Sequence, residues 1–202
     1  MEKAENEPKE FANSNRKNEL LRKTAKIFAE KGYQACTVQE IAYALSISKG
    51  GLYWHFKSKE ELYCQVCESY CISSVATIRA MLNSQDLNFT NLKIGFSALL
   101  EGYLDDPVQV DLIIDFYAES KRSPFIHSNL LGLLNKREAD LILLIDRLIT
   151  EKIITKVDSS WTARALVSAL MGLLFKYSIL KDKEATMNEF NGFFDLFFQK
   201  AI

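Results

Sequence analysis

Apolar residues recur along this chain at a period of about 3.6 positions, whereas strand-like alternation is scarce. The chain also contains only three prolines and eight glycines, so few residues interrupt a helical pattern. The pattern predicts an all-α protein of about nine helices. The first four are expected at about 15–31, 37–45, 48–56 and 58–82. The later ones are expected at about 88–104, 107–120, 124–153, 158–181 and 184–200.

Local signals mark where several of these helices begin and end. Gly32 follows the first apolar stretch and is typical of a helix C-terminus. Thr37 and Ser48 precede the next two stretches and suit the N-cap position. Pro107 and Pro124 stand at expected helix starts, where a missing N–H is tolerated.

Three short helices in the first sixty residues, the second and third joined by a tight turn, form a candidate helix-turn-helix. The apolar residues expected to join the second helix to the third are Ile41, Ala42, Ile47, Leu52 and Phe56. The opposite face of the third helix, with Lys49, Tyr53 and Trp54, is then free to enter a DNA major groove. Trp54 alternatively packs partly in the core.

Charge is distributed unevenly along the chain. Residues 15–60 carry nine Lys or Arg against four Glu, although the whole chain has a net charge of -1. A basic segment of this kind favours nucleic-acid binding, and a solvated helix face is the alternative. We expect a flexible leader at 1–14, a DNA-binding domain at 15–60 and a helical sensor and dimerisation domain at 61–202.

Composition supports an ordinary soluble protein, with 48% hydrophobic and 25% charged residues. No stretch approaches the roughly 18 uncharged apolar residues of a membrane span. Residues 1–14 are acidic and polar, unlike a signal peptide or an anchor. We therefore expect a cytoplasmic protein that does not enter a membrane.

About 45 residues resemble the DNA-binding region of the TetR family of transcriptional regulators. The resemblance rests on Gly32-Tyr33, on the segment TVQEIA at 37–42 and on ISKGGLYWHFKSKEEL at 47–62. It implies a homeodomain-like reading head, a C-terminal ligand-binding and dimerisation domain, and a double-stranded, roughly palindromic DNA operator as partner. Beyond this region the resemblance extends only to the helical layout.

The resemblance also implies roles for individual residues. Gln39 and Lys49 fall where family members reach base edges, and Gly50 and Gly51 fall where the helix approaches the groove closely. Ser48 caps this helix and is also a candidate DNA contact, and Trp54 stands between the two kinds of contact. Thr37, Tyr43, Tyr53, His55 and Lys59 fall at positions that contact phosphates. Such contacts fix the register of the protein on DNA but do not specify sequence.

Two residues depart from the usual pattern of the family. Ser46 stands where a turn glycine is common, so either Ser46 adopts a positive φ or the turn differs. Gly51 replaces a residue that often carries a hydroxyl group, which removes one possible contact to DNA.

The resemblance also implies a pocket enclosed by the fourth to eighth helices and a dimer interface on the last two, and the candidate pocket residues favour a small hydrophobic or aromatic effector. The candidate interface residues are Ala165, Ala169, Gly172, Leu173, Phe190, Phe194 and Phe197. The candidate pocket residues are Cys67, Tyr70, Phe96, Leu100, Tyr103, Phe116, Glu119 and Phe175. Either set can instead be ordinary core, and a carboxylate such as Glu119 is usually solvated.

Three cysteines, Cys64, Cys67 and Cys71, share one face of the fourth expected helix. A thiol-based redox sensor is one interpretation, and buried small apolar residues are the other. With His55 and His127 as the only histidines, no catalytic arrangement or metal site is recognisable. We therefore expect no enzymatic activity, no cofactor and no metal.

These patterns together predict a dimeric, sequence-specific DNA-binding regulator, a repressor released from its operator by a small effector. The alternative is a regulator that binds DNA constitutively or answers to a protein partner. A cavity of several hundred Å³ among the C-terminal helices favours the first, and a solid core favours the second.

Overall fold

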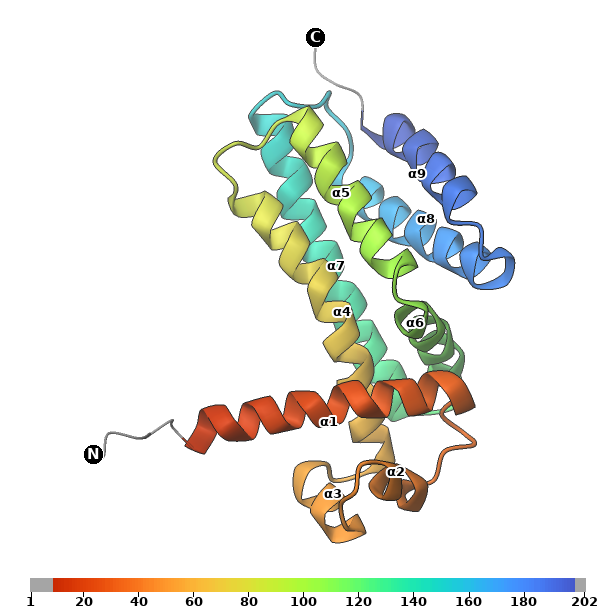
Figure 1. The fold of residues 1–202 in the computed structure, drawn as a ribbon. Helices are drawn as coiled ribbons and strands as arrows, with labels where there is room; N and C mark the ends of the chain where they lie inside the picture. The colour runs from red at the N-terminus through yellow and green to blue at the C-terminus, as the bar shows by residue number, and fades with distance from the viewer. Residues whose placement is uncertain (1–8, 199–202) are drawn as a thin grey trace, which may run out of the picture. The chain divides into compact units, whose positions relative to one another are not determined.

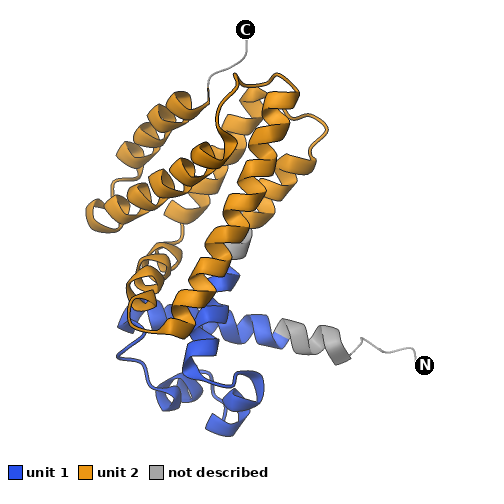
Figure 2. Ribbon diagram, turned by 180° about the vertical axis from the view of Figure 1, so that it is seen from behind, with its two compact units in different colours: residues 1–69 blue, residues 70–202 orange. Residues whose placement is uncertain are grey.

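The computed structural model describes the backbone of residues 9–198 and the side chains of residues 16–70 and 75–198. Within these bounds the chain forms nine α-helices and no β-strand, which confirms the all-α prediction (Figure 1). The chain divides into two compact units, residues 1–69 and residues 70–202 (Figure 2). The division lies within the fourth helix, whereas the sequence pattern placed the domain boundary at 60/61.

Unit 1 contains three complete helices and the beginning of a fourth. They are α1 (Lys9–Lys31), α2 (Val38–Ala44), α3 (Lys49–His55) and the first part of α4 (Lys59–Asn83). Helix α1 begins at Lys9, six residues before the expected start, so residues 9–14 of the expected leader are helical. Residues 1–8 of that leader lie outside the described residues.

The core of unit 1 is built around aromatic side chains from α1, α4 and the loop before α2. The ring of Tyr63 lies 5.0 Å from Phe28, edge to face, and 4.6 Å from Tyr33. All three side chains are buried, and each such ring contributes roughly 1.5–3 kcal/mol of hydrophobic stabilisation. Helices of seven residues such as α2 and α3 are not stable by themselves and depend on the tertiary packing of unit 1.

Unit 2 contains the rest of α4 and five further helices. They are α5 (Phe89–Leu104), α6 (Pro107–Ser120), α7 (Pro124–Thr150), α8 (Ser159–Leu180) and α9 (Lys183–Phe197). Each of these five begins at a side chain that accepts a hydrogen bond from a backbone N–H of the first turn. These N-cap residues are Asn88, Asp106, Ser123, Asp158 and Asp182.

Helix α7 packs against α6 and α8, and α9 packs against α8 and α5 (Figure 1). Two polar contacts fix this arrangement in the interior. The buried Tyr177 hydroxyl of α8 donates a 2.9 Å hydrogen bond to the backbone oxygen of Leu104 at the end of α5. Arg79 of α4 binds both carboxylate oxygens of Asp140 on α7, at 2.9 and 3.3 Å. Two-point contacts of this kind fix orientation as well as distance.

Candidate functional site

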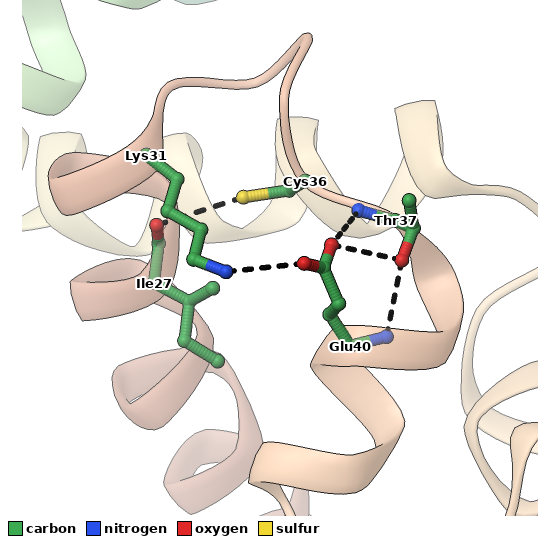
Figure 3. Close-up of polar contacts among 5 residues, drawn as sticks. All are labelled: Ile27, Lys31, Cys36, Thr37 and Glu40. Carbon is green, nitrogen blue, oxygen red and sulfur yellow. Dashed lines mark hydrogen bonds and ion pairs between the residues drawn. The ribbon is translucent and has the colours of Figure 1, made fainter.

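Helix α2 begins at a capping box that ties it to the end of α1 (Figure 3). The Glu40 carboxylate accepts hydrogen bonds of 2.9 Å from both the backbone N–H and the hydroxyl of Thr37. The Glu40 N–H donates to the Thr37 hydroxyl at 3.2 Å, and Lys31 lies 3.1 Å from the other carboxylate oxygen. The backbone N–H of Thr37, its hydroxyl and then Lys31 lower the pKa of Glu40 to about 2. The carboxylate therefore stays ionised and keeps the box closed at neutral pH.

The turn between α2 and α3 uses a left-handed residue. Ser46 has a φ of 56°, so of the two alternatives for this position the structure has the positive φ rather than a different turn. Its N–H donates to the Tyr43 oxygen and the Ile47 N–H donates to the Ala42 oxygen, each at 3.0 Å. This pair of bonds is the Schellman pattern that commonly ends a helix. A serine is held here in the conformation that glycine adopts more readily.

Helix α3 buries one face and exposes the other. Leu52 and Phe56 are each 2% exposed, whereas Tyr53 is 43% and Trp54 71% exposed. Lys49 begins the exposed face, and its ammonium lies 5.9 Å from the centre of the Tyr53 ring. The polar face predicted for a major groove is therefore open, and Tyr53 and Trp54 are not enclosed by unit 1.

The two glycines of α3 lie in its first turn. A Cβ atom on Gly50 would meet no atom closer than the Ser48 hydroxyl at 3.9 Å, so packing within the chain does not require glycine there. A Cβ on Gly51 would stand 3.3 Å from the same hydroxyl, which accepts the hydrogen bond from the Gly51 N–H at 2.9 Å. Gly51 thus makes room for the cap of its own helix.

The eleven residues predicted to contact DNA all belong to unit 1 and divide by exposure. The exposed ones are Thr37, Gln39, Tyr43, Ser48, Lys49, Gly50, Tyr53 and Trp54. The half-buried ones are Gly51, His55 and Lys59. Their contacts with DNA stay a prediction.

Two of the half-buried residues have partners inside unit 1. The Lys59 ammonium lies 4.2 Å from the centre of the Tyr33 ring, so this lysine also helps to cover the aromatic core. Burial, and then the positive charges of Arg16 and Lys17, lower the pKa of His55. His55 is therefore mostly neutral at pH 7 and can offer a ring N–H to a phosphate oxygen.

The cysteines favour packing over redox chemistry. Cys64 and Cys67 are buried in unit 1, and burial followed by the charges of Glu60 and Glu68 raises the pKa of the Cys64 thiol to about 12. A thiol with that pKa contains almost no thiolate at neutral pH, and the thiolate is the reactive form. The raised pKa therefore favours the packing interpretation for Cys64 over the redox one. The side chain of Cys71 lies outside the described residues.

Unit 2 contains a cavity of about 40 Å³ among α4, α5, α7, α8 and α9. Ile78, Phe96, Leu141 and Phe194 are among the apolar side chains that line it. Arg137 of α7 also lines it and is only 7% exposed. Of the described residues around the cavity, Arg137 alone is charged.

Only two of the eight residues predicted for a pocket line this cavity, namely Phe96 and Leu100. Cys67 belongs to unit 1, Tyr70 and Tyr103 lie elsewhere in unit 2, and Phe116 lines a smaller hollow of about 10 Å³. Glu119 is buried but binds Arg122 at 2.5 Å. Phe175 is 55% exposed and points away from the core. These six residues do not line this cavity, because periodicity shows which face is apolar but not which helix faces it, and their ligand-binding role stays a prediction.

The sequence reasoning missed Arg137 and most of the cavity wall. Arg137 occupies a position of the apolar stripe of α7, between the buried Leu130 and Leu141. A charged residue in register with a buried stripe is the signal that could have identified it.

The predicted dimer residues separate into two groups. Leu173, Phe190 and Phe194 are buried within unit 2, so assigning them to a subunit interface is wrong. Phe190, Phe194 and Phe198 follow one another at four-residue intervals and turn inward, where Phe194 lies 6.1 Å from Phe96. The second group remains available to a partner, with Gly172 exposed and Ala165, Ala169 and Phe197 half-buried.

The structure exposes more apolar residues on α8 and α9 than the sequence pattern predicted. On α8 the exposed apolar face consists of Trp161, Gly172, Phe175 and Ile179, which recur at the spacing of one helix face. On α9 it includes Phe193 and Leu196, the latter 69% exposed. Several large apolar side chains exposed on neighbouring helices are typical of an interaction site.

Helix α8 is long and apolar enough to cross a membrane by length and composition, and it is the one such helix among the described residues. Only 28% of the most apolar 18-residue stretch of α8 is buried in unit 2. Because α8 also contributes several buried core side chains, we attribute its composition to packing on both faces.

Comparison with known proteins assigns the family. Residues 20–66 match the model of bacterial regulatory proteins of the tetR family. The chain is 47% identical over 55 residues to the HTH-type transcriptional regulator YerO of Bacillus subtilis, covering 27% of this chain and 19% of that protein. It is 33% identical over 102 residues to the repressor KstR2 of Mycobacterium tuberculosis, covering 50% and 51%. The chain thus spans about half or less of these curated relatives.

The fold extends the similarity to most of the chain. The structure of the TetR family transcriptional regulator PfmR from Thermus thermophilus matches with a TM-score of 0.66 and 25% identity, over 88% of this chain and 96% of PfmR. The match at residues 20–66 includes α2, the turn and α3, whose exposed and buried faces are those of a DNA-reading helix-turn-helix. The chain is a member of the TetR family of transcriptional regulators.

Proposed function

We propose that two copies of this chain form a dimer that reads a roughly palindromic operator through paired α3 helices. As a regulator of this family the chain is not an enzyme. It acts in the cytoplasm as a repressor, and binding of a small apolar molecule to unit 2 releases it from the operator. The repressor role is supported by the similarity to KstR2, whose described function is repression.

The observation that carries the proposal is the two-sided helix α3. Its buried side, Leu52 with the following Phe56, fixes the helix on unit 1, and its exposed side presents Lys49 and Tyr53 to solvent. Lysine can bind the acceptor atoms of guanine in the major groove. Gly50, which no packing within the chain requires, lets the backbone approach the DNA closely.

The exposed apolar face of α8 and α9 supports the dimer. A Cβ atom added to Gly172 would meet no atom within 4 Å, so this position leaves space on the face for a partner helix to approach. Two reading heads held about 34–36 Å apart would meet successive turns of the same groove.

The apolar cavity supports control by a small molecule. The small size of the cavity supports the alternative, a regulator that needs no small ligand. The cavity volume of about 40 Å³ is well below the several hundred Å³ that a drug-sized ligand occupies. A regulator that answers to a protein partner, or to none, needs no cavity. A small ligand can therefore bind only if it separates the walls of the cavity. If no ligand does so, the chain is a regulator that answers to a protein partner or to none.

The reading role is tested with duplexes that the wild-type protein selects from a random-sequence library, compared with scrambled duplexes. Lys49→Ala should reduce the preference for selected over scrambled DNA by about 5-fold to 150-fold, corresponding to ~1–3 kcal/mol. Lys59→Ala should weaken binding to both duplexes alike and reduce the salt dependence by about one unit. Fluorescence anisotropy at several salt concentrations measures both effects.

Lys121→Ala, which removes an exposed lysine of unit 2, is the matched control and should change neither quantity. Because Lys59 also packs on Tyr33, the thermal midpoint of Lys59→Ala has to be measured alongside. Equal losses of preference from Lys49→Ala and Lys59→Ala would contradict the assigned roles.

A further inference from the structure

Unit 1 contains an open cleft of about 350 Å³ between α1 and α3. Its lining residues come from α1, from the turn before α3 and from α3 itself, namely Arg16, Leu20, Ile47, Gly51, Trp54 and His55. Arg16 and Trp54 are exposed whereas Leu20 is buried, so the cleft opens to solvent on the side of the first two. Three of the lining residues belong to the predicted DNA contacts of α3, but Arg16 does not. The cleft therefore adjoins the predicted DNA surface and brings a residue of α1 to it.

Gly51 keeps the cleft wide along the wall formed by α3. A Cβ atom at this position would lie 3.9 Å from the Ile47 side chain and 3.3 Å from the Ser48 hydroxyl. Because Gly51 and Ile47 both line the cleft, a larger side chain at position 51 would fill part of it. The absence of a side chain at Gly51 leaves room for a group that comes from outside the protein.

The charge around the cleft is positive. The Arg16 guanidinium is permanently charged, and the charges of Arg16 and Lys17 both act on His55. None of the residues that line the cleft carries a carboxylate. Glu19, one turn after Arg16 on α1, binds Lys23 at 2.7 Å. An anion that enters the cleft therefore meets a guanidinium and an imidazole, with no carboxylate in the lining to repel it.

We propose that this cleft receives the sugar-phosphate backbone of one DNA strand, with Arg16 binding a phosphate across the cleft from His55. Arg16 is thereby a further positioning residue, and the inference rests on the proposed DNA-reading function. A DNA strand alternates phosphates with apolar deoxyribose carbons. The guanidinium matches the phosphate through paired hydrogen bonds, and the side chains of Leu20, Ile47 and Trp54 match the sugar. A free inorganic anion would use only the first of these two features.

The test replaces single phosphates of the selected duplex with uncharged methylphosphonates and measures binding of the full chain by fluorescence anisotropy. At the linkage that lies in the cleft, this replacement should weaken binding of the wild-type protein by at least about fivefold. Arg16→Ala should be insensitive to that linkage, within about twofold, and keep its sensitivity to the others. Dependence on one linkage also distinguishes a DNA phosphate from a free anion, whose binding would affect all the duplexes alike.

Arg22→Ala is the matched control, because it removes the same exposed group from α1 at a position that does not line the cleft. It should keep the wild-type sensitivity at every linkage. Arg16→Ala should also reduce the dependence of log affinity on log salt concentration by about one unit, whereas Arg16→Lys should keep it. An Arg16→Ala protein with the wild-type sensitivity at every linkage, or an equal loss in Arg22→Ala, would overturn the proposal.

The outcome is separable from the DNA-reading proposal. A phosphate contact carries no sequence information, so Arg16→Ala should weaken selected and scrambled duplexes alike. If the preference for selected DNA depends on Lys49 but no linkage depends on Arg16, only the assignment of the cleft is refuted. If one linkage depends on Arg16 but the preference does not depend on Lys49, only the reading role of Lys49 is refuted.

Discussion

Ser46→Gly offers a quantitative test of the turn between α2 and α3. Ser46 has a φ of 56°, and a residue with a Cβ in this region costs roughly 1–2 kcal/mol relative to a right-handed conformation. Glycine removes that cost but gains freedom in the unfolded chain, which takes back roughly 0.4–1 kcal/mol. The serine side chain is exposed, and the two turn hydrogen bonds use only backbone atoms. We therefore expect Ser46→Gly to stabilise the fold by about 0.5–1 kcal/mol.

The assay is urea unfolding followed by circular dichroism, at one fixed protein concentration because dimerisation would also contribute to stability. Ala44→Gly is the matched control, since it places the same residue two positions earlier, at the last residue of α2. There glycine should cost about 1 kcal/mol, because α2 requires an ordinary helical conformation. The two substitutions should shift the midpoint in opposite directions. A Ser46→Gly protein that is destabilised by about 0.5 kcal/mol or more would refute the reasoning about strain.

Three further predictions concern packing, pH and assembly. Gly95→Ala should destabilise unit 2 by about 1–2 kcal/mol in thermal unfolding, because its Cβ would lie 2.5 Å from the Met81 sulfur. Gly102→Ala on the same helix has open space around its Cβ and should stabilise the unit. Changes of the same sign in the free energy of unfolding of the two variants would contradict this account. DNA affinity should rise as pH falls from about 8 to about 6, because His55 has a lowered pKa in the free protein and a nearby phosphate favours its protonated form, so binding takes up a proton. His55→Gln should abolish that pH dependence in anisotropy titrations, and an unchanged slope would remove His55 from the phosphate contacts. Gly172→Arg should weaken the dimer at least tenfold in analytical ultracentrifugation while Gly102→Arg leaves it intact, and a dimer that tolerates both would place the interface elsewhere.

The helix-turn-helix was predictable because short-range signals determine it. Thr37 and Ser48 act as N-caps through hydrogen bonds to residues three positions later, so the starts of α2 and α3 are encoded locally. Leu52 of α3 and Phe56, the residue that follows the helix, lie four positions apart, and both are buried. The beginning of α1 was missed because residues 9–14 lack an apolar stripe, although they continue its helix.

The cavity was not predictable, because its walls come together from five helices that are distant in sequence. Periodicity identified Phe96 and Leu100 as inward-facing, but it also favoured Phe175, which the structure exposes. The aromatic residues of α9 illustrate the limit. Phe194 and Phe193 are adjacent and equally apolar, yet the first is buried against α5 and the second is 39% exposed. Only tertiary packing decides which apolar face of α9 becomes core.

The two proposals for unit 2 are linked through helix α8. Ala169 and Leu173 line the cavity from one side of this helix, while Gly172 and Phe175 belong to its exposed apolar face. A helix moves as a rigid element, so a ligand that enlarges the cavity by displacing α8 must also displace the face offered to the partner subunit. If the ligand binds one dimeric arrangement more tightly than the other, dimerisation must change the affinity for the ligand by the same factor as the ligand changes dimerisation. A ligand effect on assembly without the reciprocal effect on ligand affinity would therefore be thermodynamically inconsistent with coupling through α8.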